Sequence, residues 1–195
     1  MMFIVLLQLL IIIIFFIYKM EQNTLNFIID PDTKGVFVSG FPELEGREGT
    51  YIGEGMAMFW GTDWHDYELF ITNTRTGKIR KLTTKGGTML VDDSEIDFEL
   101  IEKKCRHGYV NAKNKNVRYA RINRYDCFEN GICAISWVLY PDGRYFEDSD
   151  GFGGEDNDEE CVYAIINTNL DIIIPFRPVE NIKGYLNKIR SDYGK

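Results

Sequence analysis

Carboxylates crowd one short stretch of this chain, and these side chains are the best suited to hold a charged ligand. Eight of the fourteen residues from Glu147 to Glu160 are acidic, and three glycines lie among them. The run Asp148-x-Asp150-Gly151 is similar to the start of a calcium loop, in which carboxylate oxygens on a glycine-bent backbone surround the ion. The later ligand positions of such a loop are out of register here. The candidate ligands for Ca²⁺, the one cofactor indicated, are Asp148, Asp150, Glu155, Asp156 and Asp158.

The same acidic stretch has two other interpretations. It can be a docking surface for a basic protein, or a solvated loop, because like charges repel one another and extend the chain. A second candidate contact region is aromatic and spans 59–67, and partly exposed aromatic side chains mark binding surfaces. From the two regions, the candidate partner-binding residues are Trp60, Trp64, Tyr67, Glu147 and Glu159.

Signatures of catalysis are missing from the sequence. The chain has two histidines, no G-x-S-x-G, no H-E-x-x-H and no glycine-rich phosphate loop before a helix. His65 precedes Asp66, but adjacent residues of a strand point to opposite faces. A nucleophilic Cys133 with a distant histidine is conceivable, although a core cysteine is the simpler interpretation. We therefore expect a protein that is not an enzyme; the alternative is a calcium-dependent or small enzymatic protein with its site around 147–160.

The charge and the cysteines narrow the class of protein further. The formal net charge is −8, from 30 acidic and 22 basic residues. Nucleic acid is a poor partner for such a chain, because phosphate binding needs clustered Lys and Arg. We expect another protein instead, with a basic surface. An even number of cysteines permits two disulfides outside the cytoplasm, and the spacing does not resemble a zinc module; they are Cys105, Cys127, Cys133 and Cys161.

The first twenty residues differ from the rest of the chain. Residues 1–18 are apolar except for Gln8. As a helix, this run would reach about 27 Å against a hydrocarbon core of about 30 Å, and Tyr18 and Lys19 suit the interface. It is long for a signal peptide, and no small-x-small cleavage site follows. We predict an uncleaved membrane anchor over 1–20, with a cleaved signal or a buried core element as alternatives, and we expect the domain outside the cytoplasm.

Residues 21–195 have the pattern of one β-rich domain. Runs of aromatic and β-branched residues alternate with turn signals, at a spacing of about ten residues that is typical of all-β folds. The predicted strands are 26–29, 35–39, 56–60, 67–72, 79–83, 98–101, 108–111, 117–122, 132–139, 162–166 and 171–175. One stretch, 182–190, has apolar residues at helical spacing, and we expect this short helix to dock on the sheet.

Two motifs recur along the chain, which indicates a repeated unit. The first is a strand, a polar turn and a return strand, at 163–176, at 107–117 and, more loosely, at 68–79. The second is Gly53-Glu54-Gly55-Met56-Ala57, which parallels Glu129-Asn130-Gly131-Ile132-Cys133-Ala134. A single hairpin cannot bury both of its faces, whereas stacked hairpins share a core that a terminal element can cap. The helix at 182–190 is a candidate for that cap.

Both motifs resemble the WG (Trp-Gly) repeat family, whose units follow approximately W-G-Y-I-D-x-x-G-K-x-V-I-P, then Y-D, then F-x-x-G-L-A. Residues 124–134 fit the later half of a unit, 174–176 fit its return strand, and the likeness covers roughly 53–182 in three degenerate units. His107 and Tyr163 replace the family's tryptophan, and Leu170 replaces a glycine, which is unusual for a left-handed turn. The resemblance implies a binding or scaffold module of bacterial proteins, without catalytic residues.

The sequence thus predicts a mainly β fold. Repeated antiparallel hairpins, either stacked or in a partly closed sheet, follow an N-terminal membrane helix and precede a short C-terminal helix. The predicted function is a non-catalytic, membrane-anchored, bacterial protein-binding or scaffold module. One specific form is an immunity-type protein, which would block a basic partner by electrostatic complementarity.

Overall fold

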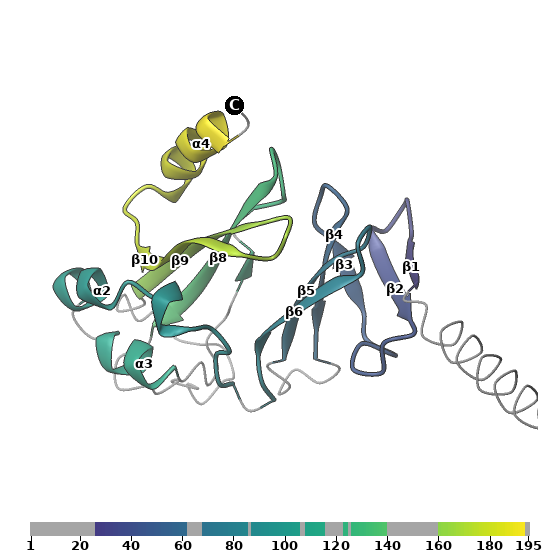
Figure 1. The fold of residues 1–195 in the computed structure, drawn as a ribbon, viewed down its shortest axis with the longest axis horizontal. Coiled ribbons are helices and arrows are strands. Elements are labelled where there is room, and N and C mark those ends of the chain that lie inside the picture. The colour runs from purple at the N-terminus through teal and green to yellow at the C-terminus, as the bar shows by residue number, and fades with distance from the viewer. Residues whose placement is uncertain are drawn as a thin grey trace, which may run out of the picture.

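Two antiparallel sheets lie next to each other, and the helices gather around the second (Figure 1). The structure is a computed structural model that describes residues 26–61, 68–85, 87–105, 108–115, 123–124, 126–139 and 160–193. The first sheet follows chain order: β1 (Asn26–Ile29), β2 (Gly35–Ser39), β3 (Gly49–Tyr51), β4 (Met56–Trp60), β5 (Leu69–Asn73) and β6 (Lys78–Thr83). The second has the order β10 (Ile172–Pro178), β9 (Glu160–Asn167), β8 (Ile132–Leu139) and β7 (Asn123–Arg124).

The helices are short and belong to the second half of the chain. They are α2 (Phe98–Lys104), α3 (Tyr109–Asn114) and α4 (Ile182–Tyr193), with a single 3₁₀ turn at Asp93–Glu95. The mainly β class is confirmed, and β1, β2, β4 and β8 have the predicted bounds. Within the described part of the chain, no helix is long and apolar enough to cross a membrane. The predicted anchor, 1–20, lies outside that part.

Two predicted strands are wrong, because 98–101 and 108–111 belong to helices. Asp97 caps α2, since its carboxylate accepts a hydrogen bond from the backbone N–H of Leu100 at 3.1 Å. No side chain caps α3. The copy of the repeat expected at 107–117 is therefore not a hairpin at its described residues. The predicted strand 117–122 lies outside the described residues, and the sequence analysis missed β3.

The remaining two copies of the repeat have the same register of strand pairing. We call β4, β5 and β6 with their turns the first unit (55–83), and β8, β9 and β10 the second unit (131–178). Met56 pairs with Asn73 in the first unit, and Ile132 pairs with Asn167 at the equivalent place in the second. Each asparagine side chain then accepts two backbone N–H hydrogen bonds from the turn that follows it. The two units are thus built on the same local turn chemistry.

The start of each unit is equivalent as well. Gly55 and Gly131 both have φ of +81°, a left-handed conformation that a side chain disfavours. The carbonyl oxygen of Gly55 accepts a hydrogen bond from Thr74 N at 2.8 Å, and that of Gly131 accepts one from Thr168 N at 3.1 Å. The second sequence motif, Gly53–Ala57 and its parallel at 129–134, therefore marks the same structural position twice.

The units stack head to tail rather than face to face. Equivalent side chains enter different cores. In the first unit, the residues that enter the large core between the sheets, here the shared core, include Met56, Met58, Leu69 and Ile71. Their equivalents in the second unit lie in another core, under α4: Ile132, Ala134, Tyr163 and Ile165. The shared core is completed by the opposite face of the second unit: Cys133, Ile135, Val162 and Ala164.

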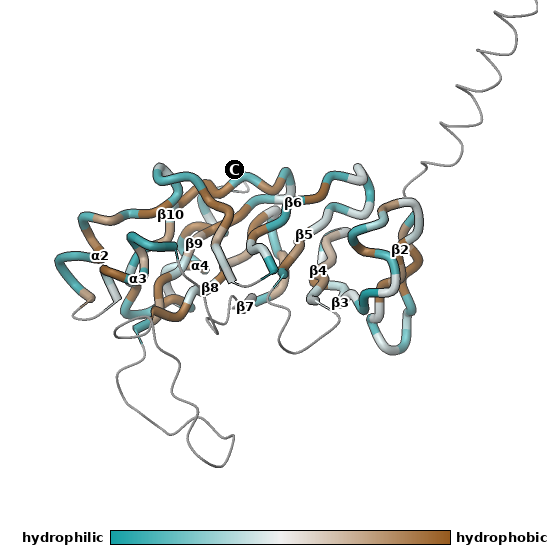
Figure 2. Tube along the Cα trace, turned by 90° about the horizontal axis from the view of Figure 1, so that it is seen from below, coloured by the Kyte–Doolittle hydropathy of each residue, from teal (hydrophilic) through white to brown (hydrophobic). Residues whose placement is uncertain are grey.

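Head-to-tail stacking leaves one face of each unit for another layer to cover. In the first unit, Ala57, Phe59 and Phe70 pack with Val36 of β2 and with Leu44 in the following turn, in what we call the first outer core. In the second unit, α4 covers the free face with Ile182 and Leu186, which form the second outer core. Apolar residues accordingly colour much of the strands brown in Figure 2. The C-terminal helix docks on the sheet as predicted.

Candidate partner-binding site

The turns of the two units meet and are joined by hydrogen bonds. The side-chain amide of Asn73 donates to the carbonyl oxygen of Thr168 at 2.9 Å. The backbone N–H of Gly131 donates to the carboxylate of Glu54 at 2.8 Å. Both β4 and β8 begin beside this contact and run away from it. Their far ends therefore lead into equivalent connections, 61–68 in the first unit and 140–159 in the second.

These two connections have the same place in the repeat but very different lengths. Trp60 at the end of β4 pairs with Leu69 of β5, so the short segment 61–68 joins two neighbouring strands. Leu139 at the end of β8 pairs with Glu160 of β9, so the much longer segment 140–159 does the same. The acidic stretch of the sequence is therefore an insertion into a connection whose two ends are fixed by strand pairing.

Both candidate contact regions fall on this one position of the repeat. Trp60 is the predicted site residue that the structure describes, and its side chain is partly exposed at 38%. The other predicted residues belong to the two connections and lie outside the described residues. In the first connection these are Trp64 and Tyr67. In the second they are the acidic residues Glu147, Asp148, Asp150, Glu155, Asp156, Asp158 and Glu159.

A charged cluster holds the base of the first connection. The Glu68 carboxylate, directly before β5, forms ion pairs with Arg47 and Lys81, and its backbone carbonyl accepts a hydrogen bond from Gly61 N at 3.0 Å. Burial raises the pKa of Glu68, but hydrogen bonds from Lys81 and Arg47 outweigh it, so that pKa lies below its ordinary value. Glu68 is thus an ionised structural residue, unsuited to proton transfer at neutral pH.

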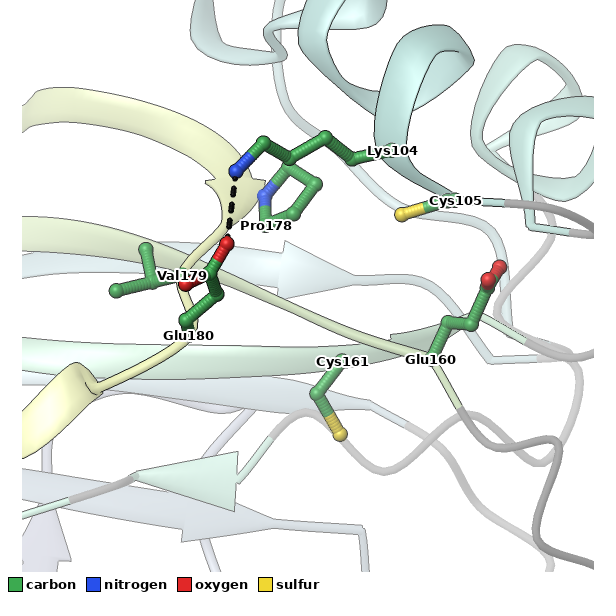
Figure 3. A pocket seen from close by; sticks show the side chains of 7 residues that line it. All are labelled: Lys104, Cys105, Glu160, Cys161, Pro178, Val179 and Glu180. Atoms are coloured by element: carbon green, nitrogen blue, oxygen red, sulfur yellow. Dashed lines mark hydrogen bonds and ion pairs between the residues drawn. The ribbon is translucent and has the colours of Figure 1, made fainter.

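An open pocket lies at the base of the second connection (Figure 3). Its volume is about 470 Å³, and the residues that line it are Lys104, Cys105, Glu160, Cys161, Pro178, Val179 and Glu180. The Glu160 carboxylate accepts a hydrogen bond from Gly108 N at 2.9 Å, and Lys104 pairs with Glu180 at 3.1 Å. Sequence reasoning missed this pocket because α2 and α3 were predicted to be strands. The cap at Asp97, with two lysines in the last turn of α2, was the available signal.

Cys105 and Cys133 are not activated as nucleophiles. No disulfide joins Cys105, Cys127, Cys133 or Cys161 in the structure, although their number permits two. Burial raises the pKa of Cys105 to about 11, and the nearby Glu160 and Cys161 contribute to this rise. Burial raises the pKa of Cys133 to about 12. Both thiols are therefore protonated at neutral pH, whereas the thiolate is the nucleophilic form.

A metal centre is not seen in the described part of the molecule. Among its residues, no three His, Cys, Asp or Glu side chains are grouped so that they could hold an ion. The predicted calcium ligands are all in 140–159, outside that part. The calcium hypothesis therefore stays a prediction.

No family model, no curated protein and no solved structure matches the chain.

Proposed function

We propose that this chain is a non-catalytic, membrane-anchored protein-binding module of the WG-repeat type. Residues 1–18 are the anchor, the domain lies outside the cytoplasm, and the two equivalent connections contact a basic partner. One observation carries the proposal. The aromatic region ends β4 with the buried Phe59 and the partly exposed Trp60 and continues into the first connection, and the acidic region lies in the equivalent connection of the second unit.

The units provide a rigid frame for such a contact. Both faces of each unit are buried, and the turns at one end are joined by hydrogen bonds. The two connections leave the frame at its other end, where β4 and β8 end. Binding residues are often carried on loops that a rigid scaffold positions. The long insertion in the second unit adds contact length without altering the register of β8 and β9.

Charge supports a basic partner. The chain has a net charge of −8, and seven carboxylates lie between 147 and 159. A surface of one sign raises the association rate with a partner of the opposite sign and disfavours partners of the same sign. An immunity-type protein that blocks a basic toxin is the specific form of this proposal.

The experiment is a capture assay with the full chain solubilised from membranes. One variant neutralises four carboxylates of the insertion, by D148N, D150N, D156N and D158N. A matched control neutralises four exposed carboxylates elsewhere, by E45Q, E48Q, E99Q and E102Q. We expect a basic protein to be captured by the wild type and by the control, to be lost with the insertion variant, and to be released as salt is raised.

Two other results would count against the proposal. Equal capture by the insertion variant and the control would remove the insertion from the interface. Capture that the wild type loses when Ca²⁺ is chelated would favour the calcium-dependent alternative. Replacement of Trp60 by Ala in the same assay then tests the aromatic connection on its own.

A further inference from the structure

The outward face of the β1–β2 hairpin carries a pair of apolar side chains where polar residues are expected. Ile28 and Phe37 are direct cross-strand partners, so their side chains lie on the same face, and they are 68% and 59% exposed. Phe27 and Val38, on the opposite face, pack against the first outer core. An antiparallel pair that covers a core on one side normally alternates with polar residues on the other. The pair Asn26 and Ser39 lies on the same outward face, so the apolar part of that face is the pair Ile28 and Phe37.

The exposed apolar side chains are concentrated there. Among the described residues, seven large apolar side chains are exposed, and three of them, Ile28, Ile29 and Phe37, belong to this hairpin. No charged residue occurs in β1 or β2. The hairpin forms the end of the molecule that is farthest from α2 and α3 (Figure 1), and β2 is largely brown in Figure 2. We call Ile28 and Phe37 the outer patch.

The sequence places the outer patch close to the proposed anchor. The apolar run ends at Tyr18 and β1 begins at Asn26, so seven residues, 19–25, separate them. Seven residues span at most about 25 Å even when fully extended. A membrane that holds residues 1–18 is therefore always within reach of this hairpin. A tethered domain needs little extra apolar contact to settle on that surface, because the tether already keeps its effective concentration high.

We propose that the outer patch rests in the interfacial region of the phospholipid bilayer that holds the anchor. The proposal builds on the membrane anchoring in the proposed function and adds the orientation of the domain. An exposed apolar pair suits this region, because apolar side chains are removed from water at the boundary between head groups and acyl chains. Carboxylates flank the hairpin at Asp30 and Asp32, and Glu48 lines the same shallow pocket as Phe37. The contact is therefore apolar, with zwitterionic rather than anionic lipid.

A second copy of the chain fits the outer patch less well. Stable protein interfaces bury about 800 Å² on each partner, and the free edge here is a four-residue strand with two exposed side chains on its outer face. A lipid surface requires no such area. Photo-cross-linking separates these occupants, because the reactive group forms an adduct with whatever covers it.

The experiment uses the full chain in phosphatidylcholine vesicles that carry a labelled lipid, with photoreactive p-benzoylphenylalanine in place of Phe37. The matched control carries the same group in place of Val110, which is 62% exposed on α3, at the other end of the molecule. After irradiation, we expect the labelled lipid to be attached to the chain modified at 37 and not to the chain modified at 110. Adding Ile28→Asp to the first chain should abolish the lipid adduct while the chain stays with the vesicles.

Each other outcome overturns the inference. A covalent dimer of the chain would assign the outer patch to a second copy. Equal lipid labelling at 37 and 110 would show that lipid contact is not specific to the patch, and no adduct at 37 would leave the patch without lipid contact; the anchor holds in both cases. A chain that does not partition with the vesicles would remove the anchor itself. That result also contradicts the membrane part of the proposed function, whereas the other outcomes leave the proposed function intact.

Discussion

The two units share a register but differ in what covers them. The free face of the first unit is covered by β1–β3, which belong to the same sheet and are tied to it by strand pairing. The free face of the second unit is covered by α4, which follows β10 after a short link and pairs with no strand. Units that stack head to tail leave two different faces at the ends of the stack, and this chain covers one with strands and the other with a helix.

The helical covering depends on a few contacts. Ile182 and Leu186 supply its buried apolar contact with the sheet, and the partly buried Tyr185 and Ile189 pack beside them. At the other end of the helix, Arg190 is 6% exposed and forms ion pairs with Asp126 at 3.1 Å and Glu129 at 3.0 Å. The strand covering is instead part of a continuous hydrogen-bonded ladder. We therefore expect α4 to open locally more readily than β1–β3.

The largest loss of stability is expected where the two units meet. Trp137 is fully buried in the shared core and packs edge-to-face on Phe176, with ring centroids 5.8 Å apart. Trp137→Ala removes this contact and leaves a cavity, and should lower the free energy of unfolding by about 3–5 kcal/mol. Urea unfolding of the full chain in detergent measures the change.

Trp60→Ala is the matched control for that prediction. Trp60 is the same residue type at the partly exposed end of β4, and its loss should change stability by less than about 0.5 kcal/mol. Where Trp137→Ala fails to fold at all, Trp137→Phe keeps most of the apolar volume and should fold with a smaller loss. Equal effects of the two alanine variants would mean that the shared core does not join the units as described.

The two coverings are compared directly by Leu44→Ala and Leu186→Ala. Both leucines are buried, Leu44 under the first unit's covering and Leu186 on the inner face of α4. Each substitution should cost about 2–5 kcal/mol of local or global stability. Hydrogen exchange should show the difference: Leu186→Ala should speed exchange in α4 alone, and Leu44→Ala should speed it across the first sheet. A uniform increase in both variants would contradict the idea that α4 is a separable layer.

The repeat was predictable because its turns are local. The left-handed backbone of Gly55 and Gly131 and the side-chain hydrogen bonds of Asn73 and Asn167 each involve only a few neighbouring residues. The sequence therefore shows both of them. The direction of stacking was not predictable. Both faces of β4 and of β8 are buried, so no polar face marks which side meets the other unit. The equivalence of the two connections likewise appears only when the registers are compared.

Two positions depart from local sequence rules for physical reasons. Leu170 departs from the glycine of the WG pattern and has φ of +69°, but its side chain is 2% exposed in the shared core. Burial of that side chain offsets the cost of the left-handed backbone. Helix α3 is short, and the carboxylate that binds its N-terminal Gly108 comes from Glu160, 52 residues away. No local pattern contains that contact.

A smaller effect is expected at the charged base of the first connection. Glu68→Gln should weaken the ion pairs with Arg47 and Lys81 and cost about 1–3 kcal/mol at neutral pH. Since the pKa of Glu68 is lowered in the folded state, its stabilisation is present above the ordinary value of 4.5 and is lost as the pH falls below it. Urea unfolding between pH 7 and pH 3 should show the wild type approaching the variant in acid. A constant difference between them would exclude Glu68 as the cause.

The smallest difference in stability is expected between alanine substitutions of the two glycines at which the units begin. Gly55 and Gly131 have the same φ of +81°, so alanine at either position should cost about 1–2 kcal/mol from the left-handed backbone alone. The surroundings differ: a Cβ at 55 would lie 2.7 Å from the Arg75 side chain, whereas one at 131 would lie 3.5 Å from the ring of Tyr193. Gly55→Ala should therefore be the more destabilising, and Arg75→Ala should reduce its excess cost because the crowding atoms belong to that side chain. Thermal melts of the three single variants and the double variant measure this coupling. An excess cost that persists without Arg75 would show that the starts of the two units differ in their backbone rather than in the side chains around them.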